Sequence, residues 1–68
     1  MKLSARNQLK GKIVSVVKGQ TTAHVRIDLG NAMVITSSIT NPAVDDLALA
    51  VGGEAFAIIK ASDVMVGN

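Results

Sequence analysis

The chain has no cysteine, no tryptophan and no tyrosine, and only one phenylalanine and one histidine, among its 68 residues. Without cysteine it can form neither a disulfide nor a thiolate zinc site. A single histidine, His24, cannot build a metal site alone, so we expect no site for a free metal cation. Nucleophilic catalysis needs a base held by an orienting partner. We therefore expect a binding protein and not an enzyme.

A chain of this length has room for one domain, which we expect to span residues 1–68. So small a domain buries only about 60% of the surface that its unfolded chain exposes. Small domains usually gain stability from disulfides, a metal or a partner subunit, and only the last is open here. Hydrophobic residues make up 49% of the chain and charged residues 18%, so surplus apolar surface is available for subunit contacts. We expect a homo-oligomer.

The basic residues are concentrated at one end of the chain. Five of them lie within residues 2–18, ahead of the first acidic residue, Asp28, and a positive segment of this kind attracts anions. The basic residues near the N-terminus also interrupt the apolar run that a signal peptide would need. No apolar run approaches the roughly 20 residues of a membrane-spanning helix. We expect a cytoplasmic protein without a membrane partner.

Alternating polar and apolar residues predict a half-buried strand over residues 22–29. Gly30-Asn31 then supplies a turn, and residues 32–40 return as a second strand, which makes a hairpin. The residues expected on the buried face of the first strand are Ala23, Val25, Ile27 and Leu29. The composition predicts further strands over residues 12–18, 54–60 and 64–66.

Asn41-Pro42 indicates a helix that ends at Gly52, with Asn41 as its cap. Asp45 and Asp46 would then lie early in the helix, where its dipole favours negative charge. The residues expected on its buried face are Val44, Leu47 and Val51. Three strands, one helix and two strands predict an all-β fold, a five-stranded OB-like barrel with one short helix between strands 3 and 4.

Barrels of this type often bind single-stranded nucleic acid by stacking bases on aromatic side chains. The only aromatic residue here is Phe56, which lies in an apolar run and is expected in the core. We therefore expect no nucleic-acid partner. An OB-type interaction module for single-stranded nucleic acid or protein stays as the alternative.

Two polar segments differ from the segments that are expected only to form the sheet and the helix. Residues 4–7 offer the hydroxyl of Ser4, the guanidinium of Arg6 and the amide of Asn7, and Arg6 can donate to two oxygens of a tetrahedral oxyanion at once. Residues 60–64 offer the charge of Lys60 and backbone N–H groups in a turn. If the two segments meet, they make a site for a small dianion. Equally, residues 4–7 can be a capping turn and Lys60 an ordinary strand-end lysine.

The same segments resemble the molbindin (Mop-domain) family along essentially the whole chain. Its characteristic run near the N-terminus is similar to Ser4-Ala5-Arg6-Asn7-Gln8-Leu9-Lys10-Gly11. Its ending is similar to Lys60-Ala61-Ser62-Asp63-Val64, and its central strand resembles Val34-Ile35-Thr36-Ser37-Ser38-Ile39-Thr40.

The resemblance implies a protein that binds molybdate, with tungstate as a second possible ligand and no organic cofactor, for storage, buffering or delivery. It also implies a hexamer, a trimer of dimers, with the anion between subunits. One chain would contribute Ser4, Ala5 and Arg6, and its neighbour Lys60, Ala61 and Ser62, with a hydroxyl from Thr40. Several family members carry serine or threonine where Ala61 stands. Alanine has no polar side chain, so here this position can bind only through its backbone, or the contact shifts to Ser62.

Molybdate accepts hydrogen bonds and has no proton to donate near neutral pH, so carboxylates should be absent from its site. Asp63 must then turn away from the anion.

Mop modules also occur fused to DNA-binding domains and to transporter ATPases, which makes a regulatory or transport fragment the second hypothesis. The chain begins with Met1 and ends just after its last predicted strand, so we expect a free-standing protein.

Overall fold

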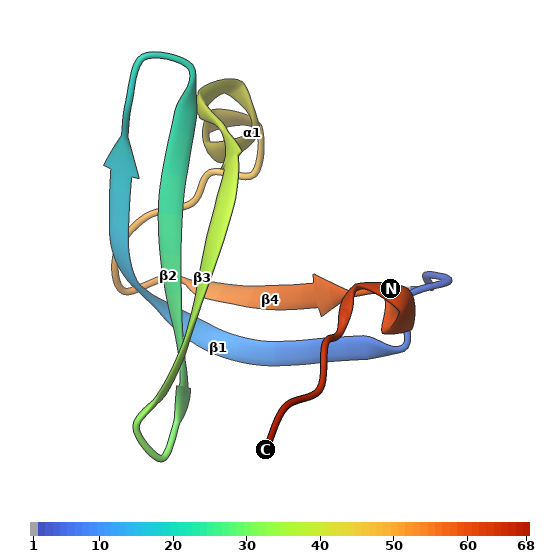
Figure 1. Cartoon of the computed structure of the whole chain (residues 1–68). Coiled ribbons are helices and arrows are strands. Elements are labelled where there is room, and N and C mark those ends of the chain that lie inside the picture. Colours follow the sequence, from blue (N-terminus) through green and yellow to red (C-terminus); the bar gives the residue numbers. More distant parts are fainter. Residues whose placement is uncertain (1) are drawn as a thin grey trace.

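The computed structural model describes residues 2–68, and over that range the chain forms a curled antiparallel sheet with one short α-helix (Figure 1). The sheet has four strands in the order β3-β2-β1-β4. The elements in chain order are β1 (Asn7–Lys18), β2 (Thr22–Gly30), β3 (Met33–Thr40), α1 (Asn41–Asp46), β4 (Glu54–Ile59) and the 3-10 turn η1 (Ala61–Asp63).

The long strand β1 pairs with two different strands along its length. Its first half pairs with β4, and its second half pairs with β2 from Lys12 onward. Between Ile13 and Ser15 the register with β2 shifts by a bulge, and a bulge bends a strand and increases its twist. Figure 1 shows the turn in β1 that results, with β4 lying across the direction of β2 and β3. This bend converts a four-stranded sheet into a partly closed barrel.

Gly11 lies just before this bend, where β1 passes close to β2. A Cβ atom at Gly11 would lie 2.6 Å from the carbonyl oxygen of Asp28 and 2.6 Å from Cγ2 of Ile27. Real Cβ atoms do not approach other atoms so closely, so either the backbone of β2 or that of β1 would have to move. Close packing of the two strands therefore requires glycine here.

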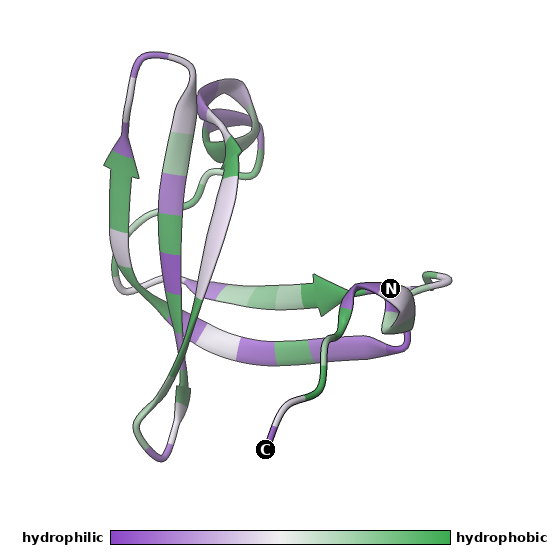
Figure 2. Cartoon of the chain, viewed as in Figure 1, coloured by the Kyte–Doolittle hydropathy of each residue, from purple (hydrophilic) through white to green (hydrophobic). Residues whose placement is uncertain are grey.

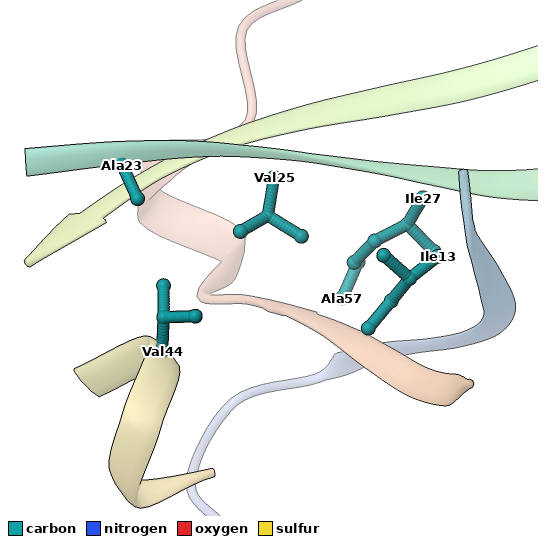
Figure 3. Close-up of a cluster of buried hydrophobic side chains, with 6 residues drawn as sticks. All are labelled: Ile13, Ala23, Val25, Ile27, Val44 and Ala57. Atoms are coloured by element: carbon teal, nitrogen blue, oxygen red, sulfur yellow. The ribbon is translucent and has the colours of Figure 1, made fainter. Parts of the chain in front are cut away.

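The core lies inside the curl. Its buried residues are Ile13, Ala23, Val25, Ile27, Val44 and Ala57. Figure 3 shows these side chains between β2, β4 and α1. The predicted alternation is confirmed in β2, where His24 and Arg26 are exposed between buried neighbours, and Figure 2 shows the same alternation of hydropathy along the strand. The predicted hairpin is also confirmed, with its turn in the left-handed region at Asn31 and Ala32.

The helix is shorter than predicted. It ends at Asp46, and the chain then adopts a left-handed conformation at Ala48 (φ 52°) that no α-helix continues through. Val44 is buried, but Leu47 and Val51 are 65% and 66% exposed. The prediction that these three residues share one buried helical face is therefore wrong for the last two.

The ends of the helix also differ from the prediction. The N-cap is Thr40 and not Asn41, because Oγ1 of Thr40 accepts a hydrogen bond from the N–H of Ala43 at 3.2 Å. Asp45 then lies at the end of the helix and not in its first turn, so it does not complement the helix dipole. It pairs instead with Lys18, whose Nζ lies 2.6 Å from Oδ1.

Two further predictions are corrected near the C-terminus. Residues 64–66 form no strand, because η1 turns the chain at the end of β4 and no neighbouring strand lies alongside them. Phe56 is 47% exposed and lies outside the core. Alternation along β4 directs Ala57 inward instead.

We expect Gly11→Ala to lower the free energy of unfolding by about 1–3 kcal/mol, the usual cost of forcing extra volume into a packed region. Urea denaturation followed by circular dichroism measures the difference. Gly67→Ala is the matched control, since nothing lies within 4 Å of a Cβ at that position. Equal midpoints for the two variants would contradict the role assigned to Gly11.

Candidate functional site

The two polar segments meet at one end of the sheet. Asn7 and Ile59 form the last pair of the β1–β4 ladder, and Nδ2 of Asn7 donates a hydrogen bond to the carbonyl oxygen of Ile59 at 3.1 Å. Arg6 therefore enters the sheet where Lys60 leaves it. Figure 1 shows the first residues of the chain beside η1 at this end. The proximity that an anion site requires is present within a single chain.

The side chains of this cluster are available to a ligand. Ser4, Arg6, Lys60 and Ser62 are exposed, and Ala5 is half-buried. Within residues 2–68, none of these hydroxyls and cations takes part in a side-chain hydrogen bond or an ion pair. The cluster thus combines two positive charges with two hydroxyl groups that have no other partner in the described chain.

η1 fixes the backbone that follows Lys60. The N–H of Asp63 donates to the carbonyl oxygen of Lys60 at 2.9 Å, and the N–H of Val64 donates to that of Ala61 at 3.2 Å. The N–H groups of Ala61 and Ser62, at the start of the turn, have no partner within it. Asp63 is exposed and is the only carboxylate of the two segments.

Thr40, the remaining predicted site residue, lies elsewhere. It ends β3 at the helix, which Figure 1 shows at the far side of the molecule from η1. Its hydroxyl caps the helix and borders a shallow hollow that is also lined by Gln20, Thr21 and Pro42. A single chain therefore does not bring Thr40 to the other six predicted residues.

Asn41 has a role that the sequence did not reveal. Its Nδ2 donates to the carbonyl oxygen of Gly19 at 2.9 Å, and its backbone N–H donates to that of Thr21 at 2.9 Å. It thereby fixes the β1–β2 loop to the start of the helix. Its Oδ1 is buried without a hydrogen-bond partner in the described structure. An asparagine before proline predicts a helix cap, so only the fold could show that Asn41 has this role instead.

Groups of three or more metal-ligating side chains are absent from residues 2–68. Over the same residues, neither helical segment has the length and apolar character needed to cross a membrane.

Comparison with known proteins identifies the family. The TOBE domain family matches residues 3–66. A relative from Haemophilus influenzae, named a probable molybdenum-pterin-binding protein, is 57% identical over 67 residues, which are 98% of this chain and 97% of the relative.

Solved structures give the same result. A molybdate-binding protein from Sporomusa ovata is similar with a TM-score of 0.93 and 32% identity, and the match covers 100% of both chains. ModG, described as a cytoplasmic molybdate-binding protein and solved with molybdate bound, is similar with a TM-score of 0.91 and 42% identity. That match covers 96% of this chain and 46% of the ModG chain.

We expect Asn7→Ala to lower the free energy of unfolding by about 0.5–1.5 kcal/mol, because it removes the hydrogen bond that joins the two polar segments. Chemical denaturation measures this difference. Gln8→Ala, at the next and exposed position, is the control and should change stability by less than about 0.5 kcal/mol. Should Asn7→Ala be as stable as the control, the bond to Ile59 does not hold the segments together.

Proposed function

Because the chain belongs to the TOBE domain family and, within it, to the molbindin (Mop) proteins, we propose that it is a molybdate-binding protein. It binds the anion as a single Mop domain spanning residues 1–68. The observation that carries the proposal is the pairing of Asn7 with Ile59, which brings the two donor segments to one end of the sheet.

The chemistry of this cluster suits a tetrahedral dianion. The guanidinium of Arg6 presents paired donors that can reach two oxygens of one anion. Lys60 adds a second positive charge, and the hydroxyls of Ser4 and Ser62 add neutral donors. Ala61 can contribute only its backbone N–H, because it has no polar side chain. Tungstate has the same shape and charge as molybdate, and the same donors would accept it.

We propose that the complete site forms between subunits of a homo-oligomer, a hexamer built as a trimer of dimers. Ser4, Ala5 and Arg6 come from one chain, and Lys60, Ala61 and Ser62 from its neighbour, at the place where the same end of two chains meets. The remote position of Thr40 supports a shared site, because only a second chain could bring that hydroxyl to the anion.

The role that fits this site is storage, buffering or delivery of molybdate in the cytoplasm, without catalytic turnover. ModG, which has a similar fold, is described as cytoplasmic. We propose no organic cofactor, although the name of the Haemophilus influenzae relative includes a pterin. The inorganic anion satisfies the donors of the cluster by itself, and the cluster contains no aromatic side chain on which a pterin could stack.

The alternative, an OB-type module for single-stranded nucleic acid or protein, is not favoured by the relatives, which are named for molybdenum or molybdate. Its signature would be polynucleotide binding that collapses with salt.

We expect Arg6→Ala and Lys60→Ala each to weaken molybdate binding by roughly 10- to 150-fold, because a hydrogen bond to a charged group contributes about 1.5–3 kcal/mol. Isothermal titration calorimetry measures the affinity, and circular dichroism confirms the fold. Lys12→Ala is the matched control, since Lys12 is an exposed lysine of β1 remote from both segments. Wild-type affinity in both site variants would remove the proposed site.

Native mass spectrometry with molybdate and excess sulfate tests the assembly and the ligand together. We expect an assembly of six chains to gain discrete increments of molybdate mass despite the excess of sulfate. The reason is that the site is shared between subunits and that molybdate, the larger of the two oxyanions, fills it. A parallel titration with a free pterin should give no increment. A monomer that takes up neither molybdate nor tungstate would contradict the proposal.

A further inference from the structure

A carboxylate lies inside the cluster that is proposed to bind an anion. Asp63 is the last residue of η1 and follows directly after the donor residues 60–62. It is the only acidic residue of the segments 4–7 and 60–64, and the proposed function assigns it no role. A negative charge beside a dianion opposes binding, so the position of Asp63 has an energetic cost for the ligand.

The turn holds Asp63 close to Lys60. The N–H of Asp63 donates to the carbonyl oxygen of Lys60 at 2.9 Å, which is the hydrogen bond that defines a 3-10 turn. In this geometry side chains three residues apart lie on the same side of the turn, separated by about 6 Å along its axis. Any anion site to which Lys60 contributes, in its own chain or in a neighbour, therefore also lies near the carboxylate of Asp63.

Neither cation of the cluster neutralises Asp63. The residue is exposed, and across residues 2–68 its carboxylate takes part in no side-chain hydrogen bond and no ion pair. Arg6 and Lys60 thus remain available to a ligand. The full charge of Asp63 also remains, and it acts on that ligand through space.

The charges of the two segments do not balance a bound dianion. Residues 4–7 carry one positive charge, on Arg6, and residues 60–64 carry one positive and one negative charge, on Lys60 and Asp63. Their net charge is therefore one positive unit, where molybdate requires two for neutralisation. Without the carboxylate of Asp63 the charge of the cluster would match that of the ligand.

A carboxylate that points away from the anion still repels it. The interaction between two charges falls only with the inverse of their distance. Salt screens it over about 8 Å at physiological ionic strength. Because Asp63 shares one short turn with three of the donor residues, it lies within this range, whereas the field of a carboxylate elsewhere on the molecule is largely screened.

We propose that Asp63 is a specificity-determining residue, which lowers the affinity of the site for doubly charged oxyanions and so keeps bound molybdate exchangeable. The inference rests on the proposed function, because it concerns the same site. Repulsion is proportional to the charge of the ligand, so a dianion is penalised by twice the free energy of a monoanion of the same size. An exchangeable ligand suits buffering and delivery better than permanent storage.

Two tetrahedral anions of similar size separate the effect of charge from that of shape, because molybdate carries two negative charges and perrhenate carries one. We expect Asp63→Asn to tighten perrhenate binding by roughly 2- to 5-fold and molybdate binding by roughly 4- to 25-fold. The second factor is the square of the first, because the free energy of repulsion doubles. Isothermal titration calorimetry at one ionic strength measures both affinities, and circular dichroism confirms the fold.

Two variants are matched controls. Asp63→Glu keeps the charge and should bind both anions within about threefold of the natural chain. Glu54→Gln removes an exposed carboxylate at the opposite end of β4, about 16 Å along the strand from Ile59. Its exposed ion pair with Lys10 contributes little stability, and salt screens its charge at that distance. We expect no more than about a twofold change in either affinity.

The two affinities distinguish repulsion from a structural role of Asp63. A structural role in η1 would change the affinity for both anions by the same factor, and that result would overturn the proposal. Unchanged or weaker molybdate binding in Asp63→Asn would overturn it too, because the carboxylate would then position Lys60 or have no effect. Equal tightening in Glu54→Gln would assign the effect to the net charge of the chain, against the proposal.

Ionic strength provides a second measurement on the same proteins. Raising it from about 0.01 M to about 1 M shortens the screening length from about 30 Å to about 3 Å. The advantage of Asp63→Asn for molybdate should then shrink to less than about twofold, because repulsion through solvent is screened. An advantage that does not depend on salt would contradict repulsion through space.

The natural chain separates this proposal from the proposed function. If it binds neither molybdate nor perrhenate, the proposed function fails, and the role of Asp63 fails with it. If it binds molybdate and Asp63→Asn binds no more tightly, only the role of Asp63 fails.

Discussion

The bend in β1 is the constraint on which the rest of the structure depends. A straight strand of this length would pair with one neighbour on each side along its whole extent. The bulge after Ile13 and the close crossing at Gly11 instead direct the first half toward β4 and the second half toward β2. The core then forms inside the angle between the two halves. The first half also ends at Asn7 opposite Ile59, which fixes where both polar segments leave the sheet.

The same bend limits how much apolar surface one chain can cover. Only six residues of the described chain form the buried core, while several large side chains of β4, of the segment after the helix and of residues 64–66 stay exposed. A domain of this size has little stability of its own. Contacts between copies would therefore contribute a larger share of the stability than in most proteins, and the ligand site and the fold would depend on the same contacts.

The sequence predicted the local features well and the long-range ones poorly. The hairpin of β2 and β3 followed from alternation and a turn, which are properties of neighbouring residues. The segments around Arg6 and Lys60 were singled out by their donors, and their meeting is a consequence of the β1–β4 register. The helix was predicted too long because the left-handed conformation at Ala48 has no signature in an alanine. Phe56 was misplaced because the sequence of β4, apolar at almost every position, does not show which face of the strand lies toward the core.

The pairing of Asn7 with Ile59 also brings together the two segments that lead to the ends of the chain. When the chain enters and leaves a domain at adjacent points, the domain can be joined to a second copy of itself through a short connection, without rearranging either sheet. It can equally be inserted into, or appended to, an unrelated protein. The match to ModG, which covers less than half of that longer chain, agrees with this property: the architecture permits a tandem arrangement in one polypeptide as readily as separate subunits.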